Sequence, residues 1–440
     1  MSSEINIRYT VQSGGSLNGV VRVPGDKSIS HRSIMLGSLA DGLTEVSGFL
    51  EGEDSLATLR AFRDMGVKID GPDNGRVVIH GVGIDGLQKP KNALDLGNSG
   101  TSMRLLSGLL AGQDFDSILI GDSSLNTRPM RRVTDPLASM GAKIETTGNG
   151  CAPLNIIGGQ SLKGIHYDMP MASAQVKSCL LLAGLYADGQ TSVAEPGVTR
   201  DHTERMLRAF DYPVEVDGNR VALQGGGRLT AAPIEVPADI SSTAFFLVGA
   251  CIAPDSKITL SHVGINPTRT GVIDILKLMG ANITLENERM AGGEPVADIV
   301  VSTSQLKGIQ IPEALVPLAI DEFPALFVAA ACAEGTTVLT GAEELRVKES
   351  DRIQVMADGL IALGVDARPT SDGMVITGGS IASGRVNSRG DHRIAMSFAM
   401  AALRASGPIE IDDCANVATS FPNFVELANS AGLSISVEKA

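Results

Sequence analysis

Basic and small polar residues gather in this sequence where apolar helices are predicted to begin. The start of a helix offers free backbone N–H groups and the positive end of the helix dipole, so it attracts anions. Ser, Asn and Asp at such positions could instead be ordinary N-caps, but caps need no cations. The motifs are PGDKSISHR (24–32), GNSGT (97–101), MASAQVK (171–177), IDEFP (320–324) and GDHR (390–393).

Three further charged segments could contribute to the same chemistry. They are NTRPMRR (126–132), RDH (200–202) and LRVKESDR (345–352). Each has an ordinary structural explanation, either a solvated helix face or salt bridges at a helix start. Neither GNSGT nor GDKS has the spacing of a Walker A loop, so no nucleotide-binding motif is indicated. Together the motifs predict a protein that binds small phosphorylated or carboxylated anions.

The elements that must position these residues repeat six times, at a spacing of roughly 70 residues, which is too long for a simple solenoid. Each repeat has a nearly all-apolar helix, a strand-like segment, and an amphipathic helix that ends near a Met-Gly-Ala pattern. A helix that is apolar on every side is buried on every side. The apolar helices are predicted to start near Ser28, Gly100, Ala172, Ile240, Phe323 and His392.

Six repeats predict an α/β protein of two similar globular domains, each with three repeats around buried helices. A proline-containing stretch at 231–237 is the predicted linker. We expect residues 23–234 to form the first domain. Residues 1–22 and 235–440 are expected to form the second, because the N-terminal strand, about residues 4–22, could pair there. The chain would then cross between the domains twice.

Composition narrows the classes of function. The net charge of −14 disfavours nucleic acid as a partner. The five cysteines are scattered and the histidines do not lie beside them at zinc spacing, which predicts no structural metal and a reducing compartment. The N-terminal segment lacks the apolar stretch of a signal peptide, and the longest apolar runs are too short to span a bilayer. We expect a cytoplasmic protein, monomeric and without a membrane partner.

Taken together, eight motifs in this order closely resemble the 3-phosphoshikimate 1-carboxyvinyltransferase (EPSP synthase) family: PGDKSISHR, LGNSGT, RPM, MASAQVKS, TRDHTE, IDEFP, RVKESDR and DHRIAM. The resemblance covers essentially the whole chain. It implies an enolpyruvyl transferase fold and a reaction of phosphoenolpyruvate with shikimate 3-phosphate that gives EPSP and phosphate. It also implies a place in the shikimate pathway, which leads through chorismate to aromatic amino acids, and no metal or organic cofactor.

The resemblance further implies roles for individual residues. Shikimate 3-phosphate would be bound by Lys27, Ser28, Arg32, Ser173, Ala174, Gln175, Arg200, Asp321 and Lys348. Phosphoenolpyruvate would be bound by Lys27, Gly100, Arg128, Gln175, Arg352 and Arg393. In this assignment Asp321 is the base that takes the hydroxyl proton. Glu349, helped by Lys27, delivers the proton to the methylene carbon.

Two departures from the family pattern matter. Many members have a second serine where this chain has Ala174, so one phosphate contact comes from a backbone N–H or is lost. MASAQVKS and IDEFPAL resemble the glyphosate-tolerant branch of the family, whereas Gly100 is the residue of glyphosate-sensitive members. We expect glyphosate to inhibit the enzyme, because alanine at position 100 would crowd the phosphoenolpyruvate site and glycine leaves space.

Two alternatives stay open at this point. One is the related UDP-N-acetylglucosamine enolpyruvyl transferase, whose loop before its Arg-Pro carries a cysteine; here residues 121–132 contain none. The other is a non-catalytic anion-binding repeat protein, which would keep the arginines but would not need Asp321 and Glu349.

Overall fold

The computed structural model describes residues 7–439, and the chain in it forms two compact units. Unit 1 contains the described residues up to Pro24, together with Pro237–Met290 and the chain from Pro295 onward. Unit 2 contains Gly25–Val236 and the short segment Ala291–Glu294. The two main boundaries fall two residues beyond the predicted ones, and the segment Ala291–Glu294 was not foreseen. That each unit is an independent domain stays a prediction.

Three buried helices form the centre of unit 2: α1 (Lys27–Leu39), α3 (Gly100–Ala111) and α5 (Ala174–Gly184). The outer helices are α2 (Glu53–Asp64), α4 (Arg131–Ser139) and α6 (His202–Ala209). Three sheets surround them, with strand orders β14-β3-β5-β4, β6-β7-β9-β8 and β10-β11-β13-β12, and β15 also pairs with β3. The strands are β3 (Ala40–Ser47), β4 (Lys68–Asp73), β5 (Arg76–Val82), β6 (Leu94–Asp95), β7 (Ser117–Ile120), β8 (Lys143–Glu145), β9 (Leu154–Ile157), β10 (His166–Asp168), β11 (Gln190–Ala194), β12 (Glu215–Asp217), β13 (Arg220–Gln224), β14 (Leu229–Thr230) and β15 (Ile234–Glu235).

Unit 1 repeats this plan around α7 (Ile240–Ile252), α9 (Phe323–Ala331) and α11 (His392–Ala401), with α8 (Gly271–Leu278), α10 (Arg352–Ala362) and α12 (Phe424–Ala431) outside. Its sheets have the orders β22-β23-β1-β24, β17-β18-β16-β2 and β19-β21-β20. The strands are β1 (Ile7–Val11), β2 (Asn18–Val21), β16 (Lys257–Gly264), β17 (Asn282–Ala291), β18 (Glu294–Ser302), β19 (Thr336–Leu339), β20 (Asp366–Pro369), β21 (Met374–Thr377), β22 (Gly384–Asn387), β23 (Ile409–Asp412) and β24 (Ile435–Lys439). Short 3₁₀ turns connect some of these elements.

The apolar helices are buried as the sequence predicts. Every residue of α7 and of α9 is buried, and four of the six predicted helix starts coincide with the observed first residue. The other two differ by one and two residues, since α1 begins at Lys27 and α5 at Ala174. Periodicity alone locates a helix end to within a residue or two, because a cap side chain decides the last step.

The amphipathic helices end with a residue in the left-handed region, as the Met-Gly-Ala pattern predicts. The six residues are Gly66, Gly141, Asp211, Gly280, Gly364 and Gly432, all with φ between 64° and 124°. Asp211 belongs to the degenerate third copy, and an aspartate tolerates this conformation better than most side chains.

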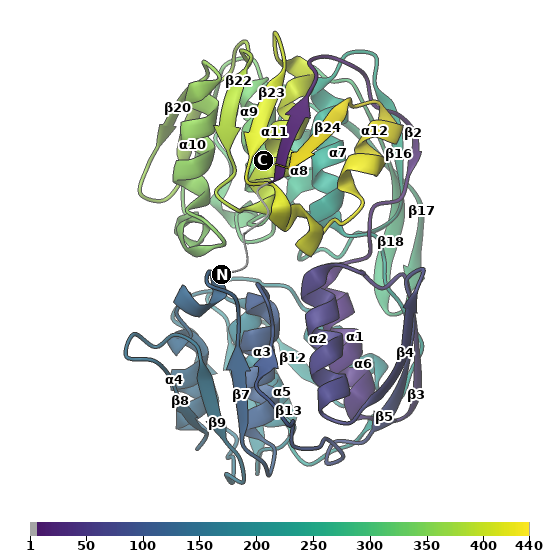
Figure 1. Ribbon diagram of the computed structural model, residues 1–440, viewed down its shortest axis with the longest axis vertical. Helices are drawn as coiled ribbons and strands as arrows, with labels where there is room; N and C mark the ends of the chain where they lie inside the picture. Colours follow the sequence, from purple (N-terminus) through teal and green to yellow (C-terminus); the bar gives the residue numbers. More distant parts are fainter. Residues whose placement is uncertain (1–6, 440) are drawn as a thin grey trace. The chain divides into compact units, whose positions relative to one another are not determined.

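The N-terminal strands complete the sheets of unit 1. β1 pairs antiparallel with β23 and with β24, so it lies between two strands from the end of the chain (Figure 1). β2 pairs in parallel with β16. The first strand of the chain thus supplies a central position in the sheet of the last repeat. The part of the expected strand at residues 4–6 lies outside the described residues.

Candidate functional site

Three motifs of unit 2 lie at the starts of its three buried helices. Lys27 and Gly100 are the first residues of α1 and α3, and Ser173 is the N-cap of α5. Ser173 Oγ accepts from the backbone N–H of Val176 at 3.4 Å. Asp26 and Ser99 cap α1 and α3 in the same way. The N-cap explanation therefore holds for these polar side chains, but it does not account for the neighbouring cations.

Lys27 and Arg32 are held by unit 2 itself. Lys27 forms an ion pair with Asp54, which lies in the first turn of α2. The Arg32 guanidinium is buried and donates to Thr203 Oγ1 at 2.7 Å, to Ser178 Oγ at 2.7 Å and to the backbone carbonyl of Ser28 at 2.9 Å. These hydrogen bonds engage all three guanidinium nitrogens. The predicted contact of Arg32 with shikimate 3-phosphate stays a prediction.

Around the start of α3, Gly100 lies beside two arginines. A Cβ atom at Gly100 would lie 3.2 Å from Arg104 Nη1 and 3.3 Å from Arg128 Nη1. Arg104 also donates to Gln175 Oε1 at 2.6 Å, and Gln175 Nε2 donates to Thr101 Oγ1 at 3.1 Å. Three of the residues predicted for phosphoenolpyruvate, Gly100, Arg128 and Gln175, therefore adjoin one another within unit 2.

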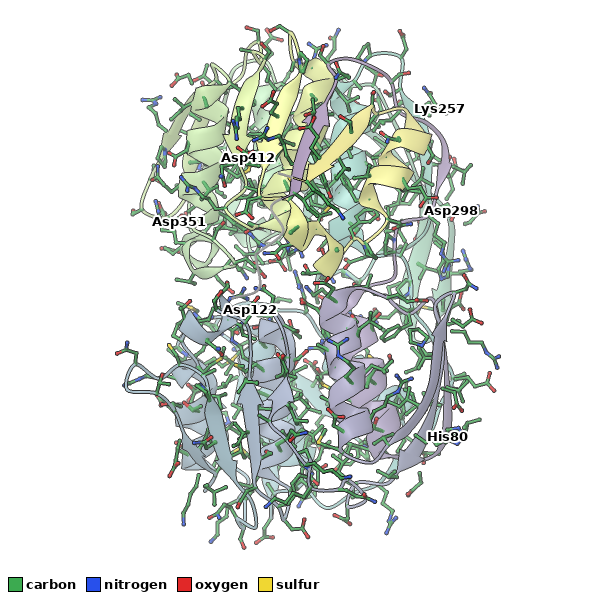
Figure 2. The ribbon with its side chains drawn as sticks, in the orientation of Figure 1. His80, Asp122, Lys257, Asp298, Asp351 and Asp412 are labelled. Atoms are coloured by element: carbon green, nitrogen blue, oxygen red, sulfur yellow. The ribbon has the colours of Figure 1, made fainter. Side chains whose placement is uncertain are left out.

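The loop before α4 presents Arg128 through short polar contacts. Arg128 Nη2 donates to Asn98 Oδ1 at 2.7 Å and to Ser124 Oγ at 3.2 Å. Asp122, labelled in Figure 2, accepts from Asn98 Nδ2 at 2.7 Å and from the backbone N–H of Leu125 at 2.7 Å. These bonds join the loop that carries Arg128 to the glycine-rich turn before α3. Arg200 lies half-buried in the loop that precedes α6.

In unit 1, Asp321 lies just before α9 and meets three cations. Its Oδ1 lies 3.3 Å from Arg352 Nη1 and 3.6 Å from Lys348 Nζ, and its Oδ2 lies 4.0 Å from Arg393 Nη2. Arg393 Nη1 also donates to the backbone carbonyl of Asp321 at 3.2 Å. The carboxylate keeps only 13% of its side-chain surface exposed. These charges hold the carboxylate in place, and its role as the base stays a prediction.

Arg352 is the centre of this cluster. It pairs with Glu349 at 2.6 Å and with Asp391 at 2.8 Å, in addition to Asp321. Burial by itself lowers the pKa of Arg352, but the negative charges of Asp391, Glu349 and Asp321 more than offset this and raise the pKa. Arg352 is therefore a permanent cation that holds the predicted base and the predicted acid on one guanidinium.

The segment 343–351 brings Lys348 and Glu349 to this cluster. Lys348 Nζ lies 2.9 Å from Glu344, one helical turn earlier. Asp351 caps α10 by accepting from the backbone N–H of Gln354 at 3.0 Å, and it pairs with Arg346 at 2.5 Å (Figure 2). The ordinary explanation of the motif as salt bridging at a helix start is thus correct for Arg346 and Asp351. Lys348, Glu349 and Arg352 instead gather around Asp321.

A buried polar chain supports the helix starts of unit 2. His31 Nδ1 lies 2.7 Å from Thr58 Oγ1, which lies 2.6 Å from Ser102 Oγ, which in turn lies 2.7 Å from Ser99 Oγ. Burial lowers the pKa of His31 well below its ordinary value, and the positive charges of Lys27 and Arg32 lower it further, against a smaller opposing effect of Asp26. A neutral His31 therefore links α1, α2 and the cap of α3.

Sequence reasoning missed three residues of these clusters, namely Asp54, Arg104 and Asp391. Arg104 gave a signal, because it is a cation within an otherwise apolar helix. Asp391 is fully buried and accepts from Arg352 and from the backbone N–H of Arg393 at 3.0 Å. Asp391 belongs to the GDHR motif, but its partner Arg352 is 39 residues away in the chain. Such long-range pairs leave no trace in local spacing.

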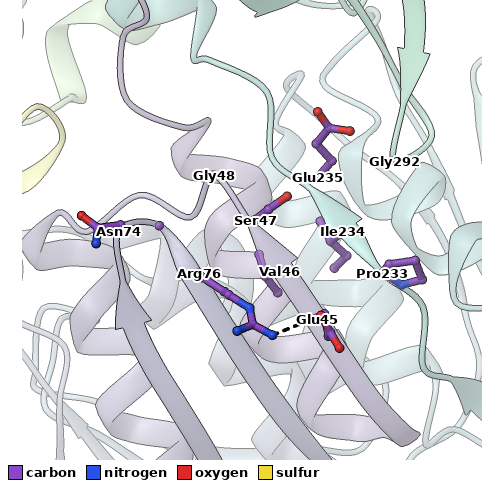
Figure 3. A pocket seen from close by; sticks show the side chains of 11 residues that line it. Glu45, Val46, Ser47, Gly48, Asn74, Arg76, Pro233, Ile234, Glu235 and Gly292 are labelled. Atoms are coloured by element: carbon purple, nitrogen blue, oxygen red, sulfur yellow. Dashed lines mark hydrogen bonds and ion pairs between the residues drawn. The ribbon is translucent and has the colours of Figure 1, made fainter.

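One pocket of unit 2 lies apart from these residues. Its volume is about 430 Å³, and it is lined by β3, β15 and the turn before β5, including Ser47, Asn74 and Ile234 (Figure 3). An ion pair of Arg76 and Glu45 at 3.5 Å lies along its wall. None of the predicted site residues lines it, so the pocket is not the candidate site.

A family model described as EPSP synthase (3-phosphoshikimate 1-carboxyvinyltransferase) matches residues 11–427. The chain is 70% identical over 432 residues to a 3-phosphoshikimate 1-carboxyvinyltransferase of Methylococcus capsulatus, which covers 98% of this chain and 99% of that protein. This chain belongs to the EPSP synthase family. A relative of the same name from Hydrogenovibrio crunogenus is 64% identical over 437 residues, with 98% of each chain covered.

Solved structures agree with the fold. The structure of an EPSP synthase from Acinetobacter baumannii matches with a TM-score of 0.89 and 63% identity, over 98% of this chain and 100% of that chain. The enolpyruvyl transferase NikO from Streptomyces tendae matches with a TM-score of 0.79 at 16% identity, over 99% and 100% of the two chains, which shows the fold alone. The predicted α/β enolpyruvyl transferase fold is confirmed. No helix in the described part of the chain has the length and apolar character needed to cross a membrane.

Proposed function

We propose that the protein transfers the enolpyruvyl group of phosphoenolpyruvate to the 5-hydroxyl of shikimate 3-phosphate, giving EPSP and inorganic phosphate. The enzyme acts in the shikimate pathway of aromatic amino acid biosynthesis. Membership of the family over nearly the whole chain carries this conclusion. The site adds chemistry that suits it, because Asp321 and Glu349 both contact the buried Arg352.

In the proposed reaction the substrate hydroxyl loses its proton to Asp321 while its oxygen bonds to the central carbon of phosphoenolpyruvate. Glu349, helped by Lys27, delivers a proton to the methylene carbon, which becomes a methyl group. The tetrahedral adduct then loses a proton from that methyl group to Glu349, now a carboxylate, as the carbon–oxygen bond to phosphate breaks. The double bond re-forms, and inorganic phosphate leaves.

The arginines and lysines of the site are proposed to bind the anionic groups of the two substrates. The two substrates together carry two phosphates and two carboxylates, which repel one another strongly. Arg128, Arg352 and Arg393, with Gly100 and Gln175, would hold phosphoenolpyruvate, because a guanidinium binds carboxylate and phosphate through paired hydrogen bonds. Lys27, Ser28, Arg32, Ser173, Ala174, Gln175, Arg200, Asp321 and Lys348 would hold shikimate 3-phosphate.

Release of inorganic phosphate tests the function directly. The protein is supplied with phosphoenolpyruvate and either shikimate 3-phosphate or UDP-N-acetylglucosamine. Phosphate released only with shikimate 3-phosphate is the expected result. Release only with the nucleotide sugar would contradict the proposed acceptor, and binding of both substrates without release would favour a non-catalytic anion-binding protein.

We also propose that glyphosate inhibits this enzyme, in spite of the likeness of MASAQVKS and IDEFPAL to the tolerant branch. An alanine at position 100 would bring a methyl group to about 3.3 Å from Arg128, and glycine leaves that space open. We expect turnover to fall as glyphosate is added at concentrations near the phosphoenolpyruvate Michaelis constant, and Gly100→Ala to weaken inhibition by about 10-fold or more, the scale of a steric clash at a packed contact. Wild-type turnover that is unchanged at glyphosate far above that constant would contradict the proposal.

The protein is further proposed to act as a monomer in the cytoplasm, without a nucleic-acid or membrane partner. The net charge of −14 supports the absence of a nucleic-acid partner, since the protein would repel a phosphate backbone. Light scattering of the purified protein tests the oligomeric state, and a mass twice that of the 45.7 kDa chain would contradict it.

A further inference from the structure

A buried group of charges lies beneath the helix starts of unit 2, apart from the residues assigned so far. Lys177 of α5 keeps 1% of its side-chain surface exposed, and its Nζ lies 2.5 Å from Glu195 and 2.6 Å from Glu204. Both glutamates are buried as well. Taking three charged groups out of water is costly and is weak evidence for added stability. A role in holding neighbouring elements in position is the better reason for this cluster.

A second set of buried contacts runs directly beside the first. Ser178 and Thr203, which follow Lys177 and precede Glu204 in the chain, join their hydroxyls at 2.8 Å. Arg32 donates to both hydroxyls. Together the two sets form one buried seam, with Arg32 and Lys177 as its cations and Glu195 and Glu204 as its carboxylates. The formal charges of this seam therefore balance. It connects α1, through Arg32, to α5 and α6.

Glu195 extends this seam to the loop that carries Arg200. Thr199 donates its hydroxyl to Glu195 Oε2, and Asn219 donates to the Glu195 backbone carbonyl at 2.7 Å. The Glu195 side chain therefore joins the two ends of the loop 195–199, and its other carboxylate oxygen is held by Lys177. Arg200 is the next residue along the chain.

We propose that Lys177, Glu195, Glu204 and Thr199 form a positioning cluster for the shikimate 3-phosphate residues of unit 2. The inference rests on the proposed function. The cluster joins α5, which carries Ser173 to Gln175 at its start, to the loop of Arg200, and the neighbouring Arg32 contacts join both to α1. Without the lysine, two buried carboxylates repel each other, and the loop and the helix start separate. Binding of shikimate 3-phosphate weakens first, because its phosphate needs all of these groups in place.

The test compares two variants that break the cluster at different points. Lys177→Met removes the central cation, and Thr199→Val removes a single hydrogen bond from a side chain of nearly the same shape. We expect Thr199→Val to raise the Michaelis constant for shikimate 3-phosphate by about 5-fold or more, and Lys177→Met by about 10-fold or more, the scale of a lost hydrogen bond to a charged group. The constant for phosphoenolpyruvate, measured at saturating shikimate 3-phosphate, should change much less.

Two controls separate positioning from a general loss of stability. Thr199→Ser keeps the hydroxyl and should restore a nearly normal Michaelis constant for shikimate 3-phosphate. Leu180→Ala opens a cavity in the fully buried core on the same helix, without removing any polar group of the cluster. It should lower the melting temperature without a selective effect on shikimate 3-phosphate.

The outcomes distinguish the inference from the proposed function. If Thr199→Val and Lys177→Met leave both Michaelis constants unchanged, or change them in parallel as Leu180→Ala does, the positioning role is wrong while the function stands. Should Lys177→Met fail to fold, Thr199→Val and Thr199→Ser decide the question alone. A wild-type protein that releases no phosphate from this substrate pair overturns the function, and the positioning role with it.

Discussion

At Asp321, one carboxylate is shared among three cations that come from two segments of unit 1, since Lys348 and Arg352 belong to the motif at 345–352 and Arg393 follows the turn before α11. Such surroundings orient the carboxylate through several ion pairs. They also leave little freedom for a replacement side chain to move. The proposed role of this residue in proton transfer can therefore be tested by changing its chemistry and keeping its shape.

We expect Asp321→Asn to lower turnover by about 100-fold or more, with little loss of substrate binding, because an amide cannot take up the hydroxyl proton. Steady-state release of phosphate measures both quantities. Asp358→Asn is the control, since Asp358 is exposed on α10 and contacts Gln354. Near-normal turnover in Asp321→Asn would remove Asp321 from this role.

His31 predicts a pH dependence of stability. Its pKa in the folded protein lies well below the ordinary value of 6.5, chiefly because of burial and then because of Lys27 and Arg32. The unfolded chain therefore takes up a proton below about pH 6.5 that the folded protein refuses, and stability is lost as the pH falls below that value. The uptake of one such proton lowers the free energy of unfolding by at most about 1.4 kcal/mol for each pH unit.

Denaturation in urea between pH 7 and pH 5 measures this slope. We expect His31→Gln to show a smaller loss of unfolding free energy over this range than the wild type, although it is less stable at pH 7. An unchanged slope in the variant would show that other groups cause the acid sensitivity. His80→Gln, at a partly exposed position of β5 where the ring contacts Asp70, serves as the control.

At the scale of elements, the caps of the buried helices do two tasks at once. Ser99 accepts from the backbone N–H of Ser102 at 3.2 Å, and its hydroxyl also ends the chain of contacts that begins at His31. The same cap therefore stabilises α3 and connects its start to α1 and α2. Because Gly100 follows directly, the cap also sets the position of the backbone proposed to meet phosphoenolpyruvate.

Ser99→Ala should lower the stability of unit 2 by about 1 kcal/mol, the usual loss for an N-cap, and the melting temperature by about 2–4 °C. The Michaelis constant for phosphoenolpyruvate should rise as well, because the start of α3 loses a contact that holds it. Ser139→Ala, at an exposed position of α4, is the control and should change neither quantity. Calorimetry together with substrate titration checks both expectations.

At the scale of the whole molecule, the two ends of the chain depend on each other. Val11 of β1 is fully buried and lies opposite Ile409 of β23 and Ile435 of β24. The sheet of the sixth repeat is complete only with this strand. Unit 1 therefore cannot assemble fully until residues from both ends of the chain are present.

Val11→Ala should destabilise this sheet by about 2 kcal/mol, from the lost methyl groups and the cavity they leave. Hydrogen exchange should then speed up at the amides of β23 and β24, while the strands of unit 2 keep their protection. Ile118→Ala, at an exposed position of β7, is the matched control. Equal exchange rates in β24 of wild type and variant would contradict the dependence.

The sequence by itself determined the six repeats, the buried helices and the left-handed helix ends. These features are local, because an apolar face, a cap or a glycine acts within a few residues of its own position. It also marked most of the polar helix starts, from Lys27 to Arg393, and the quoted motifs indicated the family. The roles given to those residues remain predictions.

Only the tertiary structure decided which distant residues meet. It paired Lys27 with Asp54, Arg352 with Asp391, and Lys177 with Glu195 and Glu204. It also placed β1 between two strands from the end of the chain. Such pairs form because buried charges and strand edges need partners, and the packing of the helices chooses among many possible partners. Spacing along the chain carries no record of that choice.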